Sequence, residues 1–150
     1  MKTVKGLHEK MGTFENANTS FHQAAKCKRY SEEVLAFSMV KEEELLRATE
    51  EIQNLTYRQG EYKIFKVFEP KERLIMALPF YDRVVQHMIC NAIQPVFENG
   101  FYYHSYACRS GKGMHAASDT LYQWMYETEV KQGLRMYAFK GDISKYFASI

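Results

Sequence analysis

The chain has 150 residues, of which 46% are hydrophobic and 15% aromatic, and its 20 Lys and Arg outnumber its 18 Asp and Glu by two. This length and composition predict one globular domain at most and exclude the disordered, collagen-like and mucin-like classes. No apolar run approaches the ~18 residues that span a bilayer, and the first twenty residues lack the apolar stretch of a signal peptide, so we expect a cytoplasmic protein without a membrane partner.

Charge divides the first part of the chain. Residues 1–30 carry six Lys and Arg against two Glu, whereas residues 31–56 carry two against seven Glu. Residues 31–56 are predicted to form an amphipathic helix with Ser31 as its N-cap, a break near Lys41 and glutamates on a solvated face. A short helix is predicted around 22–28. The apolar stripe of the helix predicted over 31–56 consists of Leu45, Ala48, Ile52 and Leu55.

The middle of the chain predicts a β-hairpin followed by a helix. YKIFKVF at 62–68 and RLIMALP at 73–79 are strand-like runs separated by Glu-Pro-Lys-Glu. A helix is then predicted from about Asp82, ended by Pro95 and Gly100. Its apolar residues recur at helical spacing, namely Tyr81, Val84, Val85, Met88, Ile89, Ala92, Ile93 and Val96.

The last part of the chain predicts a helix, a strand and the start of another helix. The first helix runs from about 113 to 130, with Gly133 as its stop signal. An apolar run over 134–142 predicts a strand in a sheet interior, and 143–150 resembles the first turns of a helix. Helices, a hairpin and a strand in this order indicate an α+β fold.

Three groups of residues are candidates for chemistry. Arg109, Lys112 and His115 lie around two glycines before a predicted helix, as in a phosphate cradle, although a flexible basic turn is an equally good interpretation. Lys71 and Arg73 lie beside the hairpin turn, where the residues alone favour a solvated turn. Asp142 ends an apolar strand and is either a metal ligand or an N-cap.

The three cysteines, Cys27, Cys90 and Cys108, are far apart and odd in number. This spacing predicts reduced thiols and no disulfide framework.

Three blocks of the sequence, taken in order, resemble the fingers and first palm motif of a reverse transcriptase. They are RLIMALPFYDRVVQHMICNAIQPVF, YACRSGKGMHAA and KGDISKYFASI. The closest resemblance is to the retron-type group, which includes retrons, diversity-generating retroelements and group II intron proteins. It covers about residues 57–150, and residues 1–56 match more loosely.

The resemblance implies an arrangement of domains and partners. Residues 1–56 would be an N-terminal helical extension, 57–133 the fingers and 134–150 the start of the palm, with helices packed on a small antiparallel sheet in a truncated right-hand polymerase. The implied activity is RNA-directed DNA polymerisation with Mg²⁺ as cofactor. The implied partners are an RNA template, a DNA or RNA primer, a deoxynucleoside triphosphate, and the missing C-terminal part of the polymerase or a second copy of the chain.

The resemblance also implies residue roles. Asp142 matches the first catalytic aspartate, which binds Mg²⁺, and the backbone of Ile143 would lie under the incoming triphosphate. Phe147 matches the steric gate that excludes a ribose 2′-hydroxyl. Lys71 and Arg73 match the cations that contact the nucleotide phosphates. Residues matching the block that lines the template path are Arg109, Lys112 and His115.

The sequence departs from the family in its carboxylates. The family places its remaining catalytic carboxylates in a Tyr-x-Asp-Asp hairpin, and this sequence contains no such tetrapeptide and no Asp-Asp pair. A two-metal site needs more than one carboxylate, so we expect these 150 residues alone to be inactive. Two alternatives remain open, a non-catalytic RNA-binding module and an oligomerising remnant of a reverse transcriptase.

Overall fold

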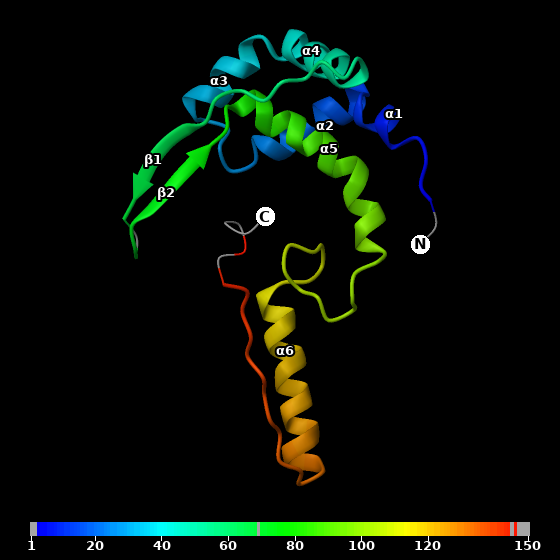
Figure 1. Cartoon of the computed structure of the whole chain (residues 1–150), viewed down its shortest axis with the longest axis vertical. Coiled ribbons are helices and arrows are strands. Elements are labelled where there is room, and N and C mark those ends of the chain that lie inside the picture. The colour runs from blue at the N-terminus through cyan, green and yellow to red at the C-terminus, as the bar shows by residue number, and fades with distance from the viewer. Residues whose placement is uncertain (1–2, 69, 145, 147–150) are drawn as a thin grey trace. The chain divides into compact units, whose positions relative to one another are not determined.

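A computed structural model describes residues 3–68, 70–144 and 146 of the chain (Figure 1). The chain divides into two compact units with the boundary between Gly100 and Phe101. Unit 1 is the part before this boundary and unit 2 is the part after it. The mixture of helices with one two-stranded antiparallel sheet confirms the predicted α+β class.

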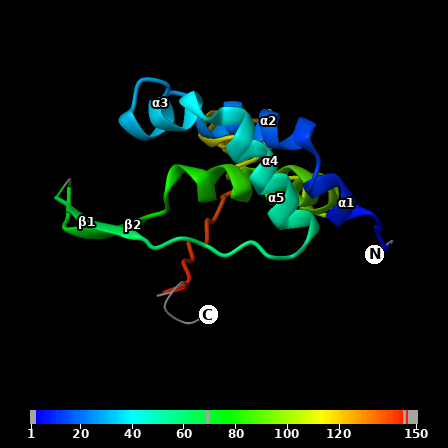
Figure 2. The ribbon, with the colours of Figure 1, turned by 90° about the horizontal axis from the view of Figure 1, so that it is seen from above.

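Unit 1 is built from five helices and the hairpin. The elements are α1 Leu7–Met11, α2 Phe14–Ala24, α3 Glu32–Met39, α4 Lys41–Gln53, β1 Lys63–Val67, β2 Arg73–Ala77 and α5 Phe80–Glu98. Helices α1, α2 and α4 pack against one another, and α5 packs against α1, α2 and α3 (Figures 1 and 2). The apolar core of the unit therefore lies among helices.

The core combines residues from four helices. Three aromatic rings meet at its centre, because Phe21 of α2 stacks on Phe37 of α3 at 5.6 Å and Phe80 of α5 meets both rings edge-on. Around them are the fully buried side chains of Leu45, Val84, Val85 and Met88. Burial of apolar side chains at about 1.5–3 kcal/mol each makes this cluster the main source of stability in unit 1.

The predicted long acidic helix is confirmed as two helices. Val40 separates α3 from α4, one residue before the predicted break at Lys41. Ser31 lies at the N-cap of α3 with an extended backbone, but its side chain makes no capping hydrogen bond. The stripe residues Leu45, Ala48 and Ile52 are buried, as predicted. The fourth is an exception, because Leu55 follows the helix with a φ of 56° and is exposed.

The predicted helix around 22–28 is wrong in position. Helix α2 begins after Thr13, whose side chain accepts a hydrogen bond from the Asn16 amide, and it ends at Ala24. The buried residues Ala17, Phe21 and Ala24 form its core-facing side. The basic residues that follow α2 lie in turns instead, since a cluster of cations adds no apolar side to a helix.

Helix α5 begins at Phe80 and continues through Pro95, so the prediction that Pro95 ends it is wrong. Proline removes one backbone N–H, which leaves the carbonyl of Asn91 without its intrahelical donor. The helix continues to Glu98 because this loss is confined to one hydrogen bond. Asn99 is its C-cap, in agreement with the predicted stop near Gly100.

The predicted hairpin is confirmed, with strands somewhat shorter than the apolar runs. The strands pair antiparallel in a register that joins Lys63 to Ala77 and Val67 to Arg73. All five residues of β1 are exposed, and β2 is exposed or half-buried throughout. Helices were expected to pack on this sheet, but the hairpin lies beside the helical core, because the helices bury their apolar sides on one another.

The described part of unit 2 contains helix α6, its π-helical continuation and two irregular segments. Helix α6 Met114–Met125 continues as a π-helix, η1 Tyr126–Lys131, and ends before Gly133, whose φ of 66° agrees with the predicted stop. The predicted strand over 134–142 is wrong, because this segment is irregular (Figure 1). A strand is stable only when its backbone pairs with another, and none of the described residues pairs with it. The predicted helix over 143–150 falls largely outside the described residues.

Candidate nucleotide and template site

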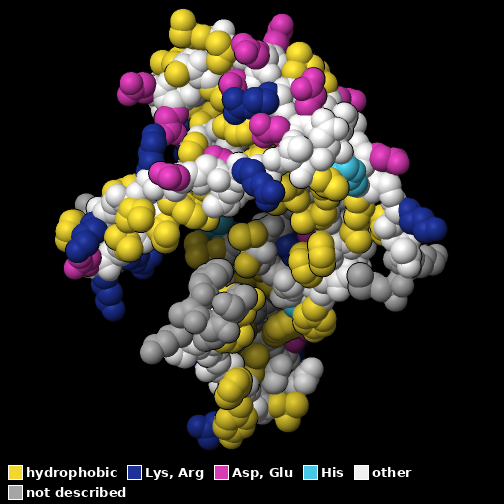
Figure 3. Space-filling model, turned by 45° about the horizontal axis from the view of Figure 1, so that its top comes forward, with side chains coloured by type: hydrophobic (Ala, Val, Ile, Leu, Met, Phe, Trp, Pro, Cys, Tyr) yellow, Lys and Arg dark blue, Asp and Glu magenta, His cyan; other side chains and the backbone are white. Residues whose placement is uncertain are grey.

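Lys71 and Arg73 border the hairpin turn of unit 1, where the sequence predicts a nucleotide contact. Arg73 forms the strand pair nearest the turn, with Val67, and Lys71 lies within the turn. Both side chains are exposed, and neither forms an ion pair with a described residue. Figure 3 shows Lys and Arg side chains at the outer end of the hairpin, beside hydrophobic side chains. Their charge is therefore available to an anion from solution.

The third cation near the turn, Lys66, forms an ion pair within the hairpin. Lys66 forms an ion pair with Glu72 at 2.6 Å. Lys66 pairs in register with Leu74, on the opposite face of the sheet from Val67 and Arg73, since neighbouring strand residues alternate. Glu72 therefore neutralises Lys66, whereas Lys71 and Arg73 form no ion pair with a described residue.

The base of the hairpin is anchored by Glu33 of α3. Its carboxylate forms an ion pair with Lys63 at the start of β1 and another with Arg83 of α5. Donation from Lys63, together with the charge of Arg83, lowers the pKa of Glu33. One carboxylate thus joins the hairpin to two helices, a connection that spacing along the chain did not predict.

A second anchor is the buried carboxylate of Asp82 in the first turn of α5. It accepts a hydrogen bond from the Tyr57 hydroxyl at 2.6 Å and another from the Gly60 amide at 3.0 Å. Burial, together with Asp82, raises the pKa of Tyr57. A Cβ atom at Gly60 would lie 3.0 Å from Asp82 Oδ2, so glycine suits the close approach. These contacts fix the segment that leads into β1.

The predicted template block forms the loop before α6 in unit 2. Arg109 donates to the backbone carbonyls of Tyr102 and Ser105, at 2.9 and 3.1 Å. Lys112 donates to the carbonyl of Tyr103 and lies over its ring, 4.1 Å from the centroid. Both side chains are half-buried. The two cations therefore hold the loop in shape, a role that the sequence did not predict for them.

Four residues of this loop and α6 form a hydrogen-bonded chain that sequence reasoning missed. His104 Nδ1 lies 2.9 Å from the Tyr106 hydroxyl, which donates to Thr120 Oγ1 at 2.8 Å, and Thr120 donates to the Ala116 carbonyl. Because the Tyr106 hydroxyl donates its proton to Thr120, it can only accept from His104, so Nδ1 is the protonated nitrogen of this histidine. The run FYYHSY at 101–106 was the available signal, since clustered aromatic residues beside cations are typical of nucleic-acid surfaces.

The remaining predicted site residues also lie in unit 2. His115 is exposed in the first turn of α6. Asp142 and Ile143 are exposed in the irregular segment that follows Gly133. Phe147 lies outside the described residues. The structure thus places Lys71 together with Arg73 in one hairpin, and Arg109 together with Lys112 in one loop.

The donor set for a metal ion consists of a single predicted carboxylate. Among the described residues, no group of three His, Cys, Asp or Glu side chains is arranged to hold a metal. Asp142 supplies one ligand, and the two-ion centres of phosphoryl transfer need several carboxylates. The residues that the structure describes therefore show one candidate carboxylate and no complete centre of this kind.

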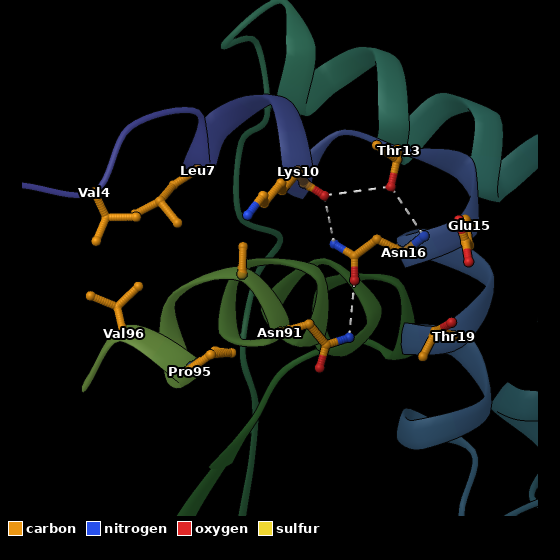
Figure 4. A pocket seen from close by; sticks show the side chains of 11 residues that line it. Val4, Leu7, Lys10, Thr13, Glu15, Asn16, Thr19, Asn91, Pro95 and Val96 are labelled. Carbon is orange, nitrogen blue, oxygen red and sulfur yellow. Dashed lines mark hydrogen bonds between the residues drawn. The ribbon is translucent and has the colours of Figure 1, made fainter. Parts of the chain in front are cut away.

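A cavity of about 550 Å³ lies among α1, α2 and α5 in unit 1 (Figure 4). Asn16 is its polar centre, because its amide donates to the carbonyls of Met11 and Met88, while its oxygen accepts from Asn91. Asn91 also donates to the buried Ser20 hydroxyl at 3.1 Å. These groups satisfy one another and so join the three helices, and the cavity is lined by a mixture of polar and apolar residues.

No helix among the described residues is both long and apolar enough to cross a membrane. All three cysteines are free and exposed, which agrees with the predicted thiols.

Comparison with models of known protein families finds no match, and comparison with curated proteins finds no relative.

Proposed function

We propose that this chain carries the fingers and first palm motif of a retron-type reverse transcriptase. In a completed polymerase it would take part in the template-directed addition of deoxynucleotides to a primer. The observation that carries the proposal is the order of the three sequence blocks, at 73–97, 106–117 and 140–150. Each block alone is weak evidence for the resemblance, whereas the three blocks together, in this order and at these distances, are specific to it.

The geometry of the hairpin supports a role in binding the nucleotide. Lys71 and Arg73 are exposed beside the turn and form no ion pair with a described residue. Such cations offset the charge of a triphosphate, and the planar guanidinium can bind two phosphate oxygens at once. Anchoring by Glu33 and Asp82 supports this role, because a site on a held element loses less entropy when it binds.

The loop before α6 supports a role in holding the template. Lys112 uses one donor for the Tyr103 carbonyl and so retains others for a phosphate oxygen. Tyr102 and Tyr103 are exposed, so bases can stack on the Tyr102 ring and on the face of Tyr103 that Lys112 does not cover. Since Arg109 braces this loop, its loss would weaken template binding chiefly through the shape of the loop.

In the completed enzyme Asp142 would contribute one carboxylate to the metal site, and the further carboxylates would come from another part of the polymerase. Mg²⁺ bound there would stabilise negative charge that develops on the phosphoryl oxygens. Exposure of Asp142 leaves its carboxylate accessible to such an ion. The chain itself supplies positioning and cationic neutralisation.

The proposal is tested with a polymerase in which this chain is followed by a palm and thumb. Primer extension on an RNA template is measured for Asp142→Asn and for Lys71→Ala combined with Arg73→Ala. The first change should abolish incorporation, and the second should raise KM for the nucleotide about tenfold or more, the effect of losing about 1.4 kcal/mol of binding. Lys66→Ala is the matched control, because this lysine pairs with Glu72. Full activity of Asp142→Asn would refute the proposal.

Phe147 provides a separate test of the resemblance in the same polymerase. A ring five residues after the aspartate would exclude the 2′-hydroxyl by steric overlap. Phe147→Ala should then increase ribonucleotide use selectively, with a much smaller change for deoxynucleotides. An unchanged ratio of the two incorporation efficiencies would show that Phe147 has a packing role.

A further inference from the structure

A basic groove in unit 1 lies apart from the hairpin turn and is not explained by the roles above. It is a cavity of about 310 Å³ between the end of α2, the loop that follows and α5. We call it the Lys28 groove, and its lining residues are Ala24, Lys28, Arg83, Gln86, His87 and Cys90. This volume is at the lower end of the range for ligand sites in proteins.

One side of α5 forms a wall of the groove. Arg83, Gln86, His87 and Cys90 recur at helical spacing and so share a side of this helix. The core-facing side carries Phe80, Val84, Val85 and Met88. The groove is therefore a polar side of a helix whose opposite side is held in the core, which makes its shape rigid.

The charge of the groove is positive. Lys28 and Arg83 are the cations that line it, and Lys26 and Arg29 lie beside Lys28 in the α2–α3 loop, which contains no acid before Glu32. Arg29 and Tyr30 line a second cavity, which shares Lys28 with the groove. The nearby carboxylate of Glu33 already pairs with Arg83 and Lys63, so one negative charge is shared by two positive ones. The Nε atom of Arg83 is buried and has no hydrogen-bond partner among the described residues. An anion entering the groove would meet the Lys28 ammonium and the Arg83 guanidinium.

The backbone of the loop holds these cations in place. Cys27 has a φ of 62°, and the Lys28 and Ser31 amides donate to the carbonyls of Ala25 and Lys28 at 3.0 and 2.9 Å. The loop is thus folded into successive tight turns. Tyr30, beside the cations, is 93% exposed, and no buried contact explains a large ring at this position.

We propose that the Lys28 groove binds the phosphate backbone of a single-stranded nucleic acid, with Tyr30 stacking on one of its bases. Lys28 and Arg29 contact phosphates, and Arg83 adds charge from the wall of the groove. Cations that follow a backbone, together with an exposed aromatic ring, are the usual means of binding single strands without reading their sequence. Binding here does not depend on the polymerase function proposed above.

The test uses the full 150-residue chain and a 5′-fluorescein-labelled twelve-nucleotide oligouridylate. Fluorescence anisotropy gives Kd at several salt concentrations. Replacing Lys28 and Arg29 by Ala should lower the log–log salt slope by about 1.4, since each phosphate contact to a single strand contributes about 0.7. Tyr30→Ala should weaken binding about tenfold, and Tyr30→Phe should bind as tightly as the unchanged chain because its ring can still stack.

A second test is Lys28→Glu, and its matched control is Lys5→Glu, which makes the same change of charge outside the groove. Lys5 precedes α1, and Figure 2 shows α1 and α3 at opposite ends of the helical unit. Lys28→Glu should weaken binding at least about tenfold at low salt, and Lys5→Glu less than about twofold. Both residues are exposed, so thermal unfolding of the two variants should match that of the unchanged chain.

Several outcomes would overturn the inference. Equal losses of affinity for the oligouridylate in Lys28→Glu and Lys5→Glu would show that binding depends only on the net charge of the chain. An effect of Lys28→Glu that is matched by Lys71→Glu, with no effect of Tyr30→Ala, would place the binding surface at the hairpin. Competition by free ATP or polyglutamate as effective as that by unlabelled oligouridylate, per unit of charge, would show a general anion site with no preference for nucleic acid.

Discussion

The two units of this chain use similar proportions of apolar residues and differ in what they bury. Unit 1 places α1, α2, α4 and α5 so that each helix has another to pack against, and its core residues reach complete burial. Unit 2 also has an amphipathic helix, yet none of its described residues is buried. An apolar side becomes a core only when a second element covers it, and the described part of unit 2 has α6 with its π-helical continuation beside irregular segments.

The polar groups follow the same contrast. In unit 1, Asp82 and Ser20 are buried and satisfied by hydrogen bonds from other elements. In unit 2, the chain from His104 through Tyr106 to Thr120 is only half-buried. Hydrogen bonds in a solvated setting add little net stability, because water competes for the same groups. Unit 1 should therefore be the more stable part.

Hydrogen exchange provides the strongest test of this difference. Amides in the centre of α5 should be protected to the level of global unfolding, whereas amides in α6 should exchange by local opening. We expect protection factors at least about a thousandfold higher in α5, the ratio for a difference of about 4 kcal/mol. Exchange resolved by NMR measures both helices in one sample. Equal protection would mean that unit 2 is covered by another part of the protein in solution.

A pair of identical substitutions sharpens the comparison. Leu45→Ala leaves a cavity in the core of unit 1 and should lower the free energy of unfolding by about 2–5 kcal/mol. Leu121→Ala removes the same atoms from α6, where the residue is 47% exposed, and should cost less than about 1 kcal/mol. Urea denaturation followed by circular dichroism gives both values. A cost at Leu121 as large as that at Leu45 would contradict the contrast.

The next prediction concerns the stability of variants at Asp82, the buried carboxylate of α5. Asp82→Ala leaves the Tyr57 hydroxyl and the Gly60 amide without their acceptor and should destabilise unit 1 by about 1–3 kcal/mol. Asp82→Asn keeps one acceptor oxygen and should cost less. Tyr57→Phe, which removes one of the two hydrogen bonds, is the matched control. If Asp82→Ala is as stable as the unchanged chain, the Asp82 carboxylate does not hold the segment before β1.

The smallest expected effect concerns alkaline pH. Burial, together with the Glu51 carboxylate that accepts from its hydroxyl, raises the pKa of Tyr81 to about 12. Between the ordinary tyrosine pKa near 10 and this value, the unfolded chain loses the proton while the folded chain keeps it, so stability falls as pH rises. Tyr81→Phe should flatten this dependence. Thermal unfolding from pH 9 to 11 measures it, and an unchanged slope would remove Tyr81 from the explanation.

Local patterns predicted α3, α4, the start of α5 and the hairpin of unit 1, for reasons visible in single residues, whereas α1 was not predicted and α2 was misplaced. Leu45, Ala48 and Ile52 repeat at helical spacing, and this is the spacing of the buried side of α4. Two runs of aromatic and branched residues on either side of Glu-Pro-Lys-Glu predicted the hairpin, because the turn is decided locally. The left-handed Gly133 likewise ended the helix of unit 2. Each of these features is determined by residues that are close to one another in the sequence.

The roles of the charged residues were much harder to predict. Lys71 and Arg73 are exposed as expected, whereas Lys112 and Arg109 turn inward to the carbonyls of their own loop. No spacing rule separates these two pairs, since all four are cations near turns. The difference depends on whether backbone acceptors lie within reach, which is a property of the folded loop.

The sequence by itself determined that helices cover most of 31–56, that a hairpin joins 62–68 to 73–79 and that Gly133 follows the end of a helix. Helical periodicity, turn residues and glycine conformation act within a few residues, which is why these features could be predicted. Only the tertiary structure decided that the apolar run at 134–142 is not a strand, since a strand needs a partner. It also decided that Glu33 joins the hairpin to α5 and that Lys28 faces Arg83 across a groove. These relations join residues 30 to 55 positions apart, where only the packing of helices brings side chains together.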